Sequence, residues 1–388
     1  MPRPDLTAPP PTTRTMRDLH WIRGALQSAI AIEHATMPVY AAAMYSLEVQ
    51  NYPAYNTLRS VLMEEMLHMA AACNTLAALG GRPRIRQLDP TAVRRGLPGL
   101  VAPGLTARFA QLSRPQLETF MRIESPLGLL PGDQRRKRYP TIGSLYADVK
   151  KAVLDNADTV AAAIRGTRVA NQVGGNIGYA AIERDAPLDA VLDALDLIMN
   201  QGEGYGNTTL SSGPGSAGEL SHYARFAELR YGRRWSGPRD AADTFTAEGQ
   251  RRYFQGEKIE WPRVVNTLAV PDDGYAAILR LDPDRDDVLT QLRAFDTAYT
   301  RMLAALDDSW NGPAATSWPS LGRAVFEMNE LRVTSCFNIL RHQIPPSAVA
   351  KLPELYPAEY ADLRALSDLT RPLYYGPRFL NTSLTSHP

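Results

Sequence analysis

The stretch EEMLHMAAACNTLAALGG, residues 64–81, decides the fold of this 388-residue chain. Its apolar residues recur at steps of three and four, as they do on the buried face of an α-helix. Glu65 and His68 lie on that same face, three positions apart. The glycine pair at 80–81 supplies the left-handed conformation that ends many helices. The pattern therefore predicts a helix from Pro53 to these glycines, with an acid and an imidazole on its buried side.

The preceding segment, residues 16–49, shows the same helical periodicity. A single acid, Glu33, sits inside its apolar stripe. Pro38 lacks the N–H that would bond to the carbonyl of His34, so a kink is expected just past Glu33. A carboxylate within a buried stripe costs several kcal/mol unless it is paired or neutralised. Glu33 on its own would fit a core carboxylate held by a hydrogen bond.

The pattern repeats farther along the chain. Residues 188–204 form a third amphipathic helix with Glu203 on its apolar stripe. A loop then leads to residues 219–231, predicted as a helix that carries Glu219 and His222 three positions apart. Four helices thus each place a carboxylate on the buried side, in the order Glu, Glu-x-x-His, Glu, Glu-x-x-His.

This order is typical of bundles that hold two metal ions between four helices. One Glu-x-x-His is usually a surface accident, but four converging carboxylates would repel one another strongly unless cations neutralised them. Carboxylate and imidazole ligands together suit iron or manganese better than metals that prefer thiolate ligands. The sequence predicts two iron ions, with manganese or a mixed pair as the alternative. The predicted ligands, which are also the predicted catalytic residues, are Glu33, Glu65, His68, Glu203, Glu219 and His222.

Further polar residues lie close to these motifs in the sequence. Since metal ligands normally have hydrogen-bonded partners, some of them are expected to orient ligands or to contact substrate. These are Glu64, Tyr40, Tyr205, Tyr223 and Arg225. His34 and Glu228 lie off the apolar stripes and are expected either at the surface or behind the ligands.

The remaining segments suggest the organisation of the chain. Residues 82 to about 140 are rich in Pro, Arg and Gly and are expected to cross the surface with short helices, while 141–165 is predicted to be helical. Two more helices are predicted near 285–310 and 319–342 as core-packing partners. We therefore expect a flexible arm (1–16), a bundle (17–235) with an insertion at about 82–187, a helical C-terminal extension (236–370) and a tail (371–388).

Composition excludes several classes of function. Forty-two Lys and Arg balance forty-one Asp and Glu, so no net field attracts nucleic acid. No uncharged apolar stretch approaches the roughly 20 residues needed to cross a bilayer. The proline-rich start lacks the apolar run of a signal peptide. Two cysteines fit a reducing compartment, and we expect a cytoplasmic protein that contacts neither nucleic acid nor membrane.

Four segments resemble a known family: IEHATMPVYAAAMYSL (32–47), EEMLHMAAACNTLAALGGRP (64–83), IMNQGEG (198–204) and ELSHYARFAEL (219–229). They are similar to the ferritin-like domain of iminophenyl-pyruvate dimer synthase-type proteins, which serve bisindole pigment and antibiotic biosynthesis. The resemblance covers about 17–235. It implies an all-α, ferritin-like four-helix bundle with long insertions and additional C-terminal helices. It also implies metal ligands at Glu33, Glu65, His68, Glu203 and His222, and the group's association with haem leaves haem as an alternative cofactor.

The resemblance implies a bacterial biosynthetic oxidase or oxygenase. We expect a non-haem di-iron enzyme that uses O2 on a small organic metabolite, amino-acid-derived in the family's case, with an external electron donor and a homo-oligomer both left open. The family's pigment enzymes are longer chains that join two imines derived from aromatic amino acids, and imine coupling is one alternative here. Ferroxidase or iron-handling activity is another, although ferritin chains lack such long insertions. A metal-free structural protein is the third.

Overall fold

The computed structural model describes residues 17–48, 53–166, 171–174, 181–202, 220–237 and 251–384. Within these residues the regular structure is helical, and extended backbone pairs only at isolated bridges. The predicted all-α class is therefore confirmed. The predicted flexible arm, residues 1–16, lies outside the described ranges. In the part of the chain that is described, no helix is both long and apolar enough to span a lipid bilayer.

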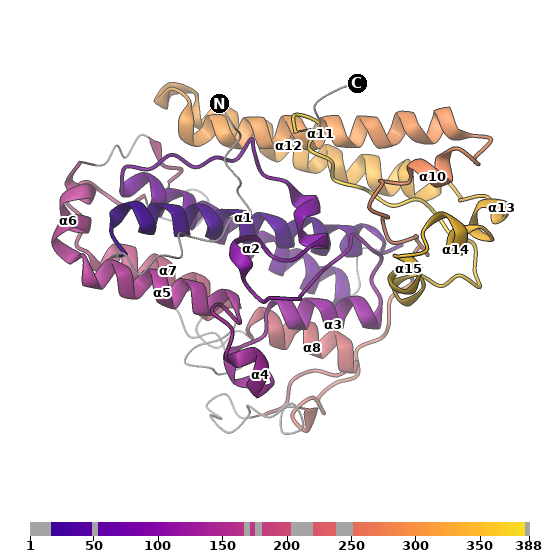
Figure 1. Ribbon diagram of the computed structural model, residues 1–388, viewed down its shortest axis with the longest axis horizontal. Helices are drawn as coiled ribbons and strands as arrows, with labels where there is room; N and C mark the ends of the chain where they lie inside the picture. The colour runs from indigo at the N-terminus through magenta and orange to yellow at the C-terminus, as the bar shows by residue number, and fades with distance from the viewer. Residues whose placement is uncertain are drawn as a thin grey trace.

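Two long helices, α1 (Leu19–Tyr45) and α2 (Pro53–Ala78), form the centre of the molecule (Figure 1). They run antiparallel, since Arg23 near the start of α1 donates a hydrogen bond of 2.6 Å to the carbonyl of Leu79 just past α2. Both helices match the predicted segments. Pro38 lies inside α1, which the structure describes as one helix. Gly80 takes the predicted left-handed conformation, with φ of +74°.

Four shorter helices pack on one side of the α1/α2 pair (Figure 1). Contacts join α5 to α1, α7 to α2, and α3 to α8, while α8 also reaches α2 and α7. Their starts follow ordinary capping rules, because Ser or Thr side chains accept hydrogen bonds from the first turns of three of them. The four are α3 (Arg114–Ile123), α5 (Ile142–Asp155), α7 (Asp189–Gly202) and α8 (His222–Tyr231).

Three sequence expectations for this side were wrong in detail. The segment 141–165 is two helices, α5 and α6 (Ala157–Arg165), that break at Asn156. The segment 82–140 is not merely a surface excursion, because Leu117 and Phe120 of α3 are fully buried. The helix predicted over 219–231 begins at His222, since the Ser221 side chain caps it and Ser221 has extended backbone.

A second pair of long helices covers the opposite side of α1 and α2 (Figure 1). These helices, α11 (Arg285–Asn311) and α12 (Ser317–Phe337), pack along each other and correspond to the two predicted core partners. Short helices complete the described chain. They are α4 (Gly132–Arg135), α10 (Ala276–Leu279), α13 (Pro346–Val349), α14 (Leu352–Leu355) and α15 (Tyr360–Leu366).

The C-terminal segment is fixed to the core as far as residue 384. The guanidinium of Arg378 donates to Asp296 Oδ2 of α11 at 2.7 Å, and the backbone N–H of Leu380 donates to Asp296 Oδ1 at 3.1 Å. Asp296 is only 1% exposed. Phe379 packs edge-on against Phe295 in the same region. One buried carboxylate therefore holds the tail against α11.

We expect Asp296→Asn to lower the free energy of unfolding by about 3 kcal/mol, because it leaves the Arg378 charge buried without a counter-ion. Urea unfolding followed by circular dichroism measures the change. Glu327→Gln is the control, since its partner Arg301 is largely exposed and such pairs contribute less than about 1 kcal/mol. Equal losses in the two variants would contradict this account of the tail.

Candidate metal centre

Helices α1 and α2 place three of the predicted ligands together. Glu65 and His68, one turn apart on α2, face the side covered by α3, α5, α7 and α8, and Glu33 of α1 lies beside them. Their exposed fractions are 2% for Glu33, 2% for Glu65 and 1% for His68. Carboxylates so deeply buried must be compensated by hydrogen bonds, protons or cations.

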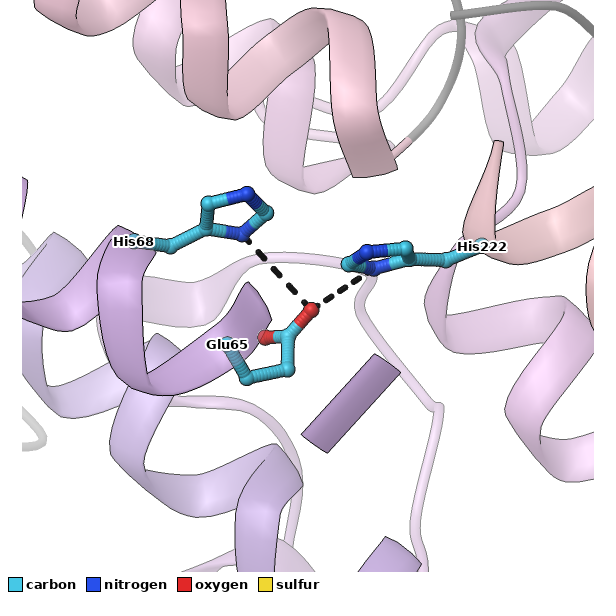
Figure 2. A group of neighbouring side chains, drawn as sticks. All are labelled: Glu65, His68 and His222. Atoms are coloured by element: carbon cyan, nitrogen blue, oxygen red, sulfur yellow. Dashed lines mark ion pairs between the residues drawn. The ribbon is translucent and has the colours of Figure 1, made fainter. Parts of the chain in front are cut away.

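His222 brings the second imidazole from the first turn of α8. Its Nδ1 lies 2.7 Å from Glu65 Oε1, while Nδ1 of His68 lies 3.7 Å from the same oxygen. Figure 2 shows both rings turned toward this one carboxylate. The ring centroids are 5.4 Å apart and the planes are inclined by 23°. Glu65 is therefore the central group of the cluster.

A further carboxylate stands on each side of Glu65. Oε2 of Glu33 lies 3.7 Å from Nδ1 of His68, and Oε2 of Glu124 lies 3.7 Å from Nδ1 of His222. The cluster is thus two histidine–glutamate pairs that share Glu65 between them. Carboxylates and imidazoles from facing helices are the donor types that helical bundles use to bind metal ions.

Glu124 was missed by the sequence analysis, which treated its segment as a surface excursion. The residue follows α3 directly as its C-terminal cap and is 3% exposed. A signal was nevertheless present. Leu117, Phe120 and Met121 make a buried helical stripe, and Glu124 continues it at the same three-and-four spacing.

Each histidine is held from behind through its Nε2 atom. His68 Nε2 lies 2.7 Å from Gln201 Oε1 of α7, and His222 Nε2 lies 3.0 Å from Glu64 Oε2 of α2. Arg225 in turn donates to both carboxylate oxygens of Glu64. Because these partners accept from Nε2, each ring directs Nδ1 into the cluster. The structure thus places Glu64 and Arg225 behind a predicted ligand.

Hydroxyl groups hold the carboxylates. Tyr146 of α5 donates to Glu33 Oε1 at 2.6 Å, and Tyr40 of α1 donates to Glu124 Oε1. The hydroxyl of Thr36 lies 3.0 Å from Glu65 Oε2. Of these three groups, only Tyr40 was among the residues predicted to assist the ligands. Tyr223 is buried, and burial raises its pKa.

The structure does not describe every residue predicted for this site. Glu203, Glu219 and Tyr205 lie outside the described residues, so their roles stay predictions. The remaining two off-stripe residues, His34 and Glu228, are buried at 2% and 4% exposure, so a surface position was wrong for both.

Protons on the two imidazoles balance much of the carboxylate charge in the cluster. Burial alone would lower the pKa of His68, but the neighbouring carboxylates of Glu33 and Glu65 raise it to about 10. Burial likewise opposes a charged His222, yet Glu124, Glu64 and Glu65 raise its pKa well above the usual value. Burial raises the pKa of Glu33 to about 7. Protonated imidazoles thus stand where cations would neutralise the carboxylates.

The pKa of Glu64 is shifted in the direction opposite to that of Glu33. Burial would raise its pKa, but hydrogen bonds from His222 and Arg225 outweigh burial and lower the pKa to about 2. The neighbouring imidazoles of His222 and His68 likewise outweigh burial for Glu65 and lower its pKa. Both groups are therefore ionised near neutral pH.

The donor set fits a metal ion. One ligand atom from each of Glu65, His68 and His222 can be chosen so that all three lie within 4.8 Å of one another. Nδ1 of His222 is buried and makes no hydrogen bond of good geometry, although Glu65 Oε1 is near. A buried nitrogen left unpaired is costly unless a ligand completes it. The cavity beside the carboxylates measures about 10 Å³, which is the space of an ion or a water.

The arrangement defines a class of protein: a helical bundle with a candidate centre of carboxylate and imidazole donors between its helices. A family model described as ferritin-like matches residues 26–231, more than half of the chain. The chain belongs to this ferritin-like family.

Comparison with solved structures agrees on the fold. A ferritin-like protein from Caulobacter vibrioides is similar, with a TM-score of 0.52 and 18% sequence identity over 83% of this chain and 96% of that one. No curated protein matches the sequence. The resemblance to the dimer synthase type thus stays a prediction.

We expect metal binding to strengthen as the pH rises from about 6 to 8. Ions must displace protons from His68, His222 and partly protonated Glu33, so each proton displaced raises the apparent affinity about tenfold per pH unit. Titration calorimetry with Mn2+ in buffers of different ionisation enthalpy counts the protons released. An affinity that stays constant or falls with rising pH would refute this description of the metal-free cluster.

Glu124→Gln is expected to lose one of two bound ions, because it removes the carboxylate beside His222 while preserving side-chain volume. Metal content after equilibration with Mn2+ and desalting measures the loss. Glu228→Gln is the matched control. Glu228 is also buried, but it binds Arg234 and the N–H of Trp235 instead of the cluster. If both variants kept two ions, Glu124 would not be a ligand.

Proposed function

We propose that this protein is a non-haem di-iron oxidoreductase that uses O2 on a small organic metabolite in bacterial secondary metabolism. The observation that carries the proposal is the central position of Glu65 between two buried histidine–glutamate pairs. When bound, iron would supply the one-electron chemistry with O2 that protein side chains lack. Manganese suits the same donors, and the metal content of the purified protein decides between them.

The side chains of this chain would have three tasks. Glu65, Glu33 and Glu124 supply negative charge that holds cations, and both histidines supply neutral nitrogen donors once deprotonated. Gln201 and the Glu64–Arg225 pair fix the ring orientations, so little reorganisation is needed when an ion enters. Burial raises the pKa of Glu33 to about 7, so an entering cation would have to displace a proton from part of the Glu33 population near neutral pH.

The surroundings exclude bulk water from the cluster. Ile142 of α5 and Ile198 and Met199 of α7 line its small cavity together with the ligands. Apolar walls strengthen the electrostatic interactions inside and limit side reactions with solvent. The cavity is too small for a haem, so the described residues support separate ions at this cluster rather than haem.

Ferroxidase activity is the second candidate, and the size of the cavity favours it. About 10 Å³ is the space of an ion, a water or O2. Coupling of two aromatic imines would need a much larger space at the same place. Oxidation of Fe2+ itself by O2 needs none.

The proposal is tested by loading the metal-free protein with two Fe2+ per chain without oxygen and then adding O2. We expect O2 uptake and iron oxidation faster than in protein-free buffer. Glu65→Gln should abolish the acceleration, because the charge shared by both sides of the cluster is lost, whereas Glu228→Gln should retain it. An absence of iron binding, or equal rates with Glu65→Gln and wild type, would overturn the proposal.

The same experiment separates the two candidates. With a large excess of Fe2+, continued turnover that deposits ferric iron without any organic reductant indicates a ferroxidase. Oxidation that stops after the bound pair, and resumes only when a reductant regenerates Fe2+, indicates an oxidase or oxygenase awaiting its substrate.

A further inference from the structure

A second cavity lies on the other face of the α1/α2 pair, away from the carboxylate cluster. It measures about 400 Å³ and is enclosed by α1, α2, α11 and α12, with Phe379 of the C-terminal segment. Its volume falls within the roughly 300–1,000 Å³ of small-molecule sites. Neighbouring residues of α1 and α2 divide between the two faces. Glu33 and His68 belong to the cluster, whereas the residues that follow them, His34 and Met69, line the cavity.

The chemistry of the lining is unusual. Six of the eleven methionines of the chain line the cavity, and no Asp, Glu, Lys or Arg does. Unbranched thioether side chains adapt to ligands of varied shape. A charged ligand would be buried here without a counter-ion, which is costly. The lining therefore favours an uncharged molecule with a large apolar surface.

Polar atoms are confined to a few places in the cavity. The Tyr299 hydroxyl and His34 Nε2 form a hydrogen bond of 2.5 Å between α11 and α1. Trp310 donates its N–H to Asn74 Oδ1, and its side chain lines the cavity. The Tyr45 hydroxyl, on the same lining, makes no hydrogen bond to another described residue. One polar group of a ligand could pair with Tyr45 while the rest meets apolar surface.

The cavity has an open mouth and a closed floor. Met63 of α2 and Val325 of α12 are 46% and 56% exposed, whereas Met69 and Trp310 at the floor are 4% and 3% exposed. A flat protein partner could cover the mouth but could not fill the floor. The depth thus suits a small molecule that enters between α2 and α12.

We propose that this cavity, the methionine pocket, binds an uncharged and largely apolar small molecule, such as an aromatic or aliphatic compound with one polar group. Its binding does not require the metal centre, because no predicted or observed ligand side chain lines it. The α1/α2 pair then contributes to two sites, a candidate site for metal ions on one face and a pocket for an apolar molecule on the other.

The test uses N-phenyl-1-naphthylamine, a neutral probe whose fluorescence rises in apolar surroundings. We expect saturable binding at one site per chain of the purified full-length protein, and much weaker binding of the anionic probe 8-anilinonaphthalene-1-sulfonate. Val325→Lys should weaken binding of the neutral probe at least about tenfold, because it places an ammonium at the mouth. Glu65→Gln should bind it as the wild type does.

Phe326→Lys is the matched control. Phe326 is the next residue of α12 and is 62% exposed, but it does not line the pocket. The same charge placed there should leave probe binding unchanged. Ala70→Phe fills the pocket from α2 and should abolish binding while circular dichroism shows a folded chain. No saturable binding by the wild type, or equal loss with Phe326→Lys and Val325→Lys, would overturn the proposal.

Discussion

The cost of burying carboxylates between helices is the constraint on which this structure depends. Glu65 is 2% exposed, and its charge is met by the imidazoles of His68 and His222. An uncompensated carboxylate there would cost several kcal/mol or would be neutralised by a proton. α2 supplies Glu65 and His68 within one turn, and the position of α8 is what brings His222 to the opposite side of the carboxylate. The packing of α8 against α2 is thus tied to the charge of Glu65.

The sequence could reveal the ingredients of this site but not the whole constellation. Glu33, Glu65 and His68, which the structure brings together, could be singled out because each sits inside an apolar helical stripe, and that signal is local. Glu124 follows a short helix in a segment rich in proline and arginine, so its stripe was hidden by composition. Gln201 and Tyr146 carry no local signal, since their roles exist only after α5 and α7 pack on α1 and α2. The start of α8 was misplaced by three residues because the capping of Ser221 was overlooked.

The α1/α2 pair serves two different environments through ordinary helix geometry. Successive residues point about 100° apart around a helix, so an acid on one face is followed by an apolar or neutral residue on another. His34 shows the effect of the second environment. Burial lowers its pKa to about 3, so it stays neutral beside Tyr299 even though Glu33 is its chain neighbour. Charge is thereby confined to one side of a layer that is only one helix thick.

The two halves of the cluster are alike in their ligands but not in what stands behind them. His222 is backed by the carboxylate of Glu64, which Arg225 keeps ionised, whereas His68 is backed by the neutral amide of Gln201. An imidazole whose far N–H faces a carboxylate is the more basic donor. An ion beside His222 and Glu124 would therefore be bound more tightly than one beside His68 and Glu33. At the half with Gln201 and Glu33 a proton would compete with the ion for the Glu33 carboxylate, because burial raises the pKa of Glu33 to about 7. The two halves therefore differ in expected metal affinity, because a charged Glu64 backs His222 and a neutral Gln201 backs His68.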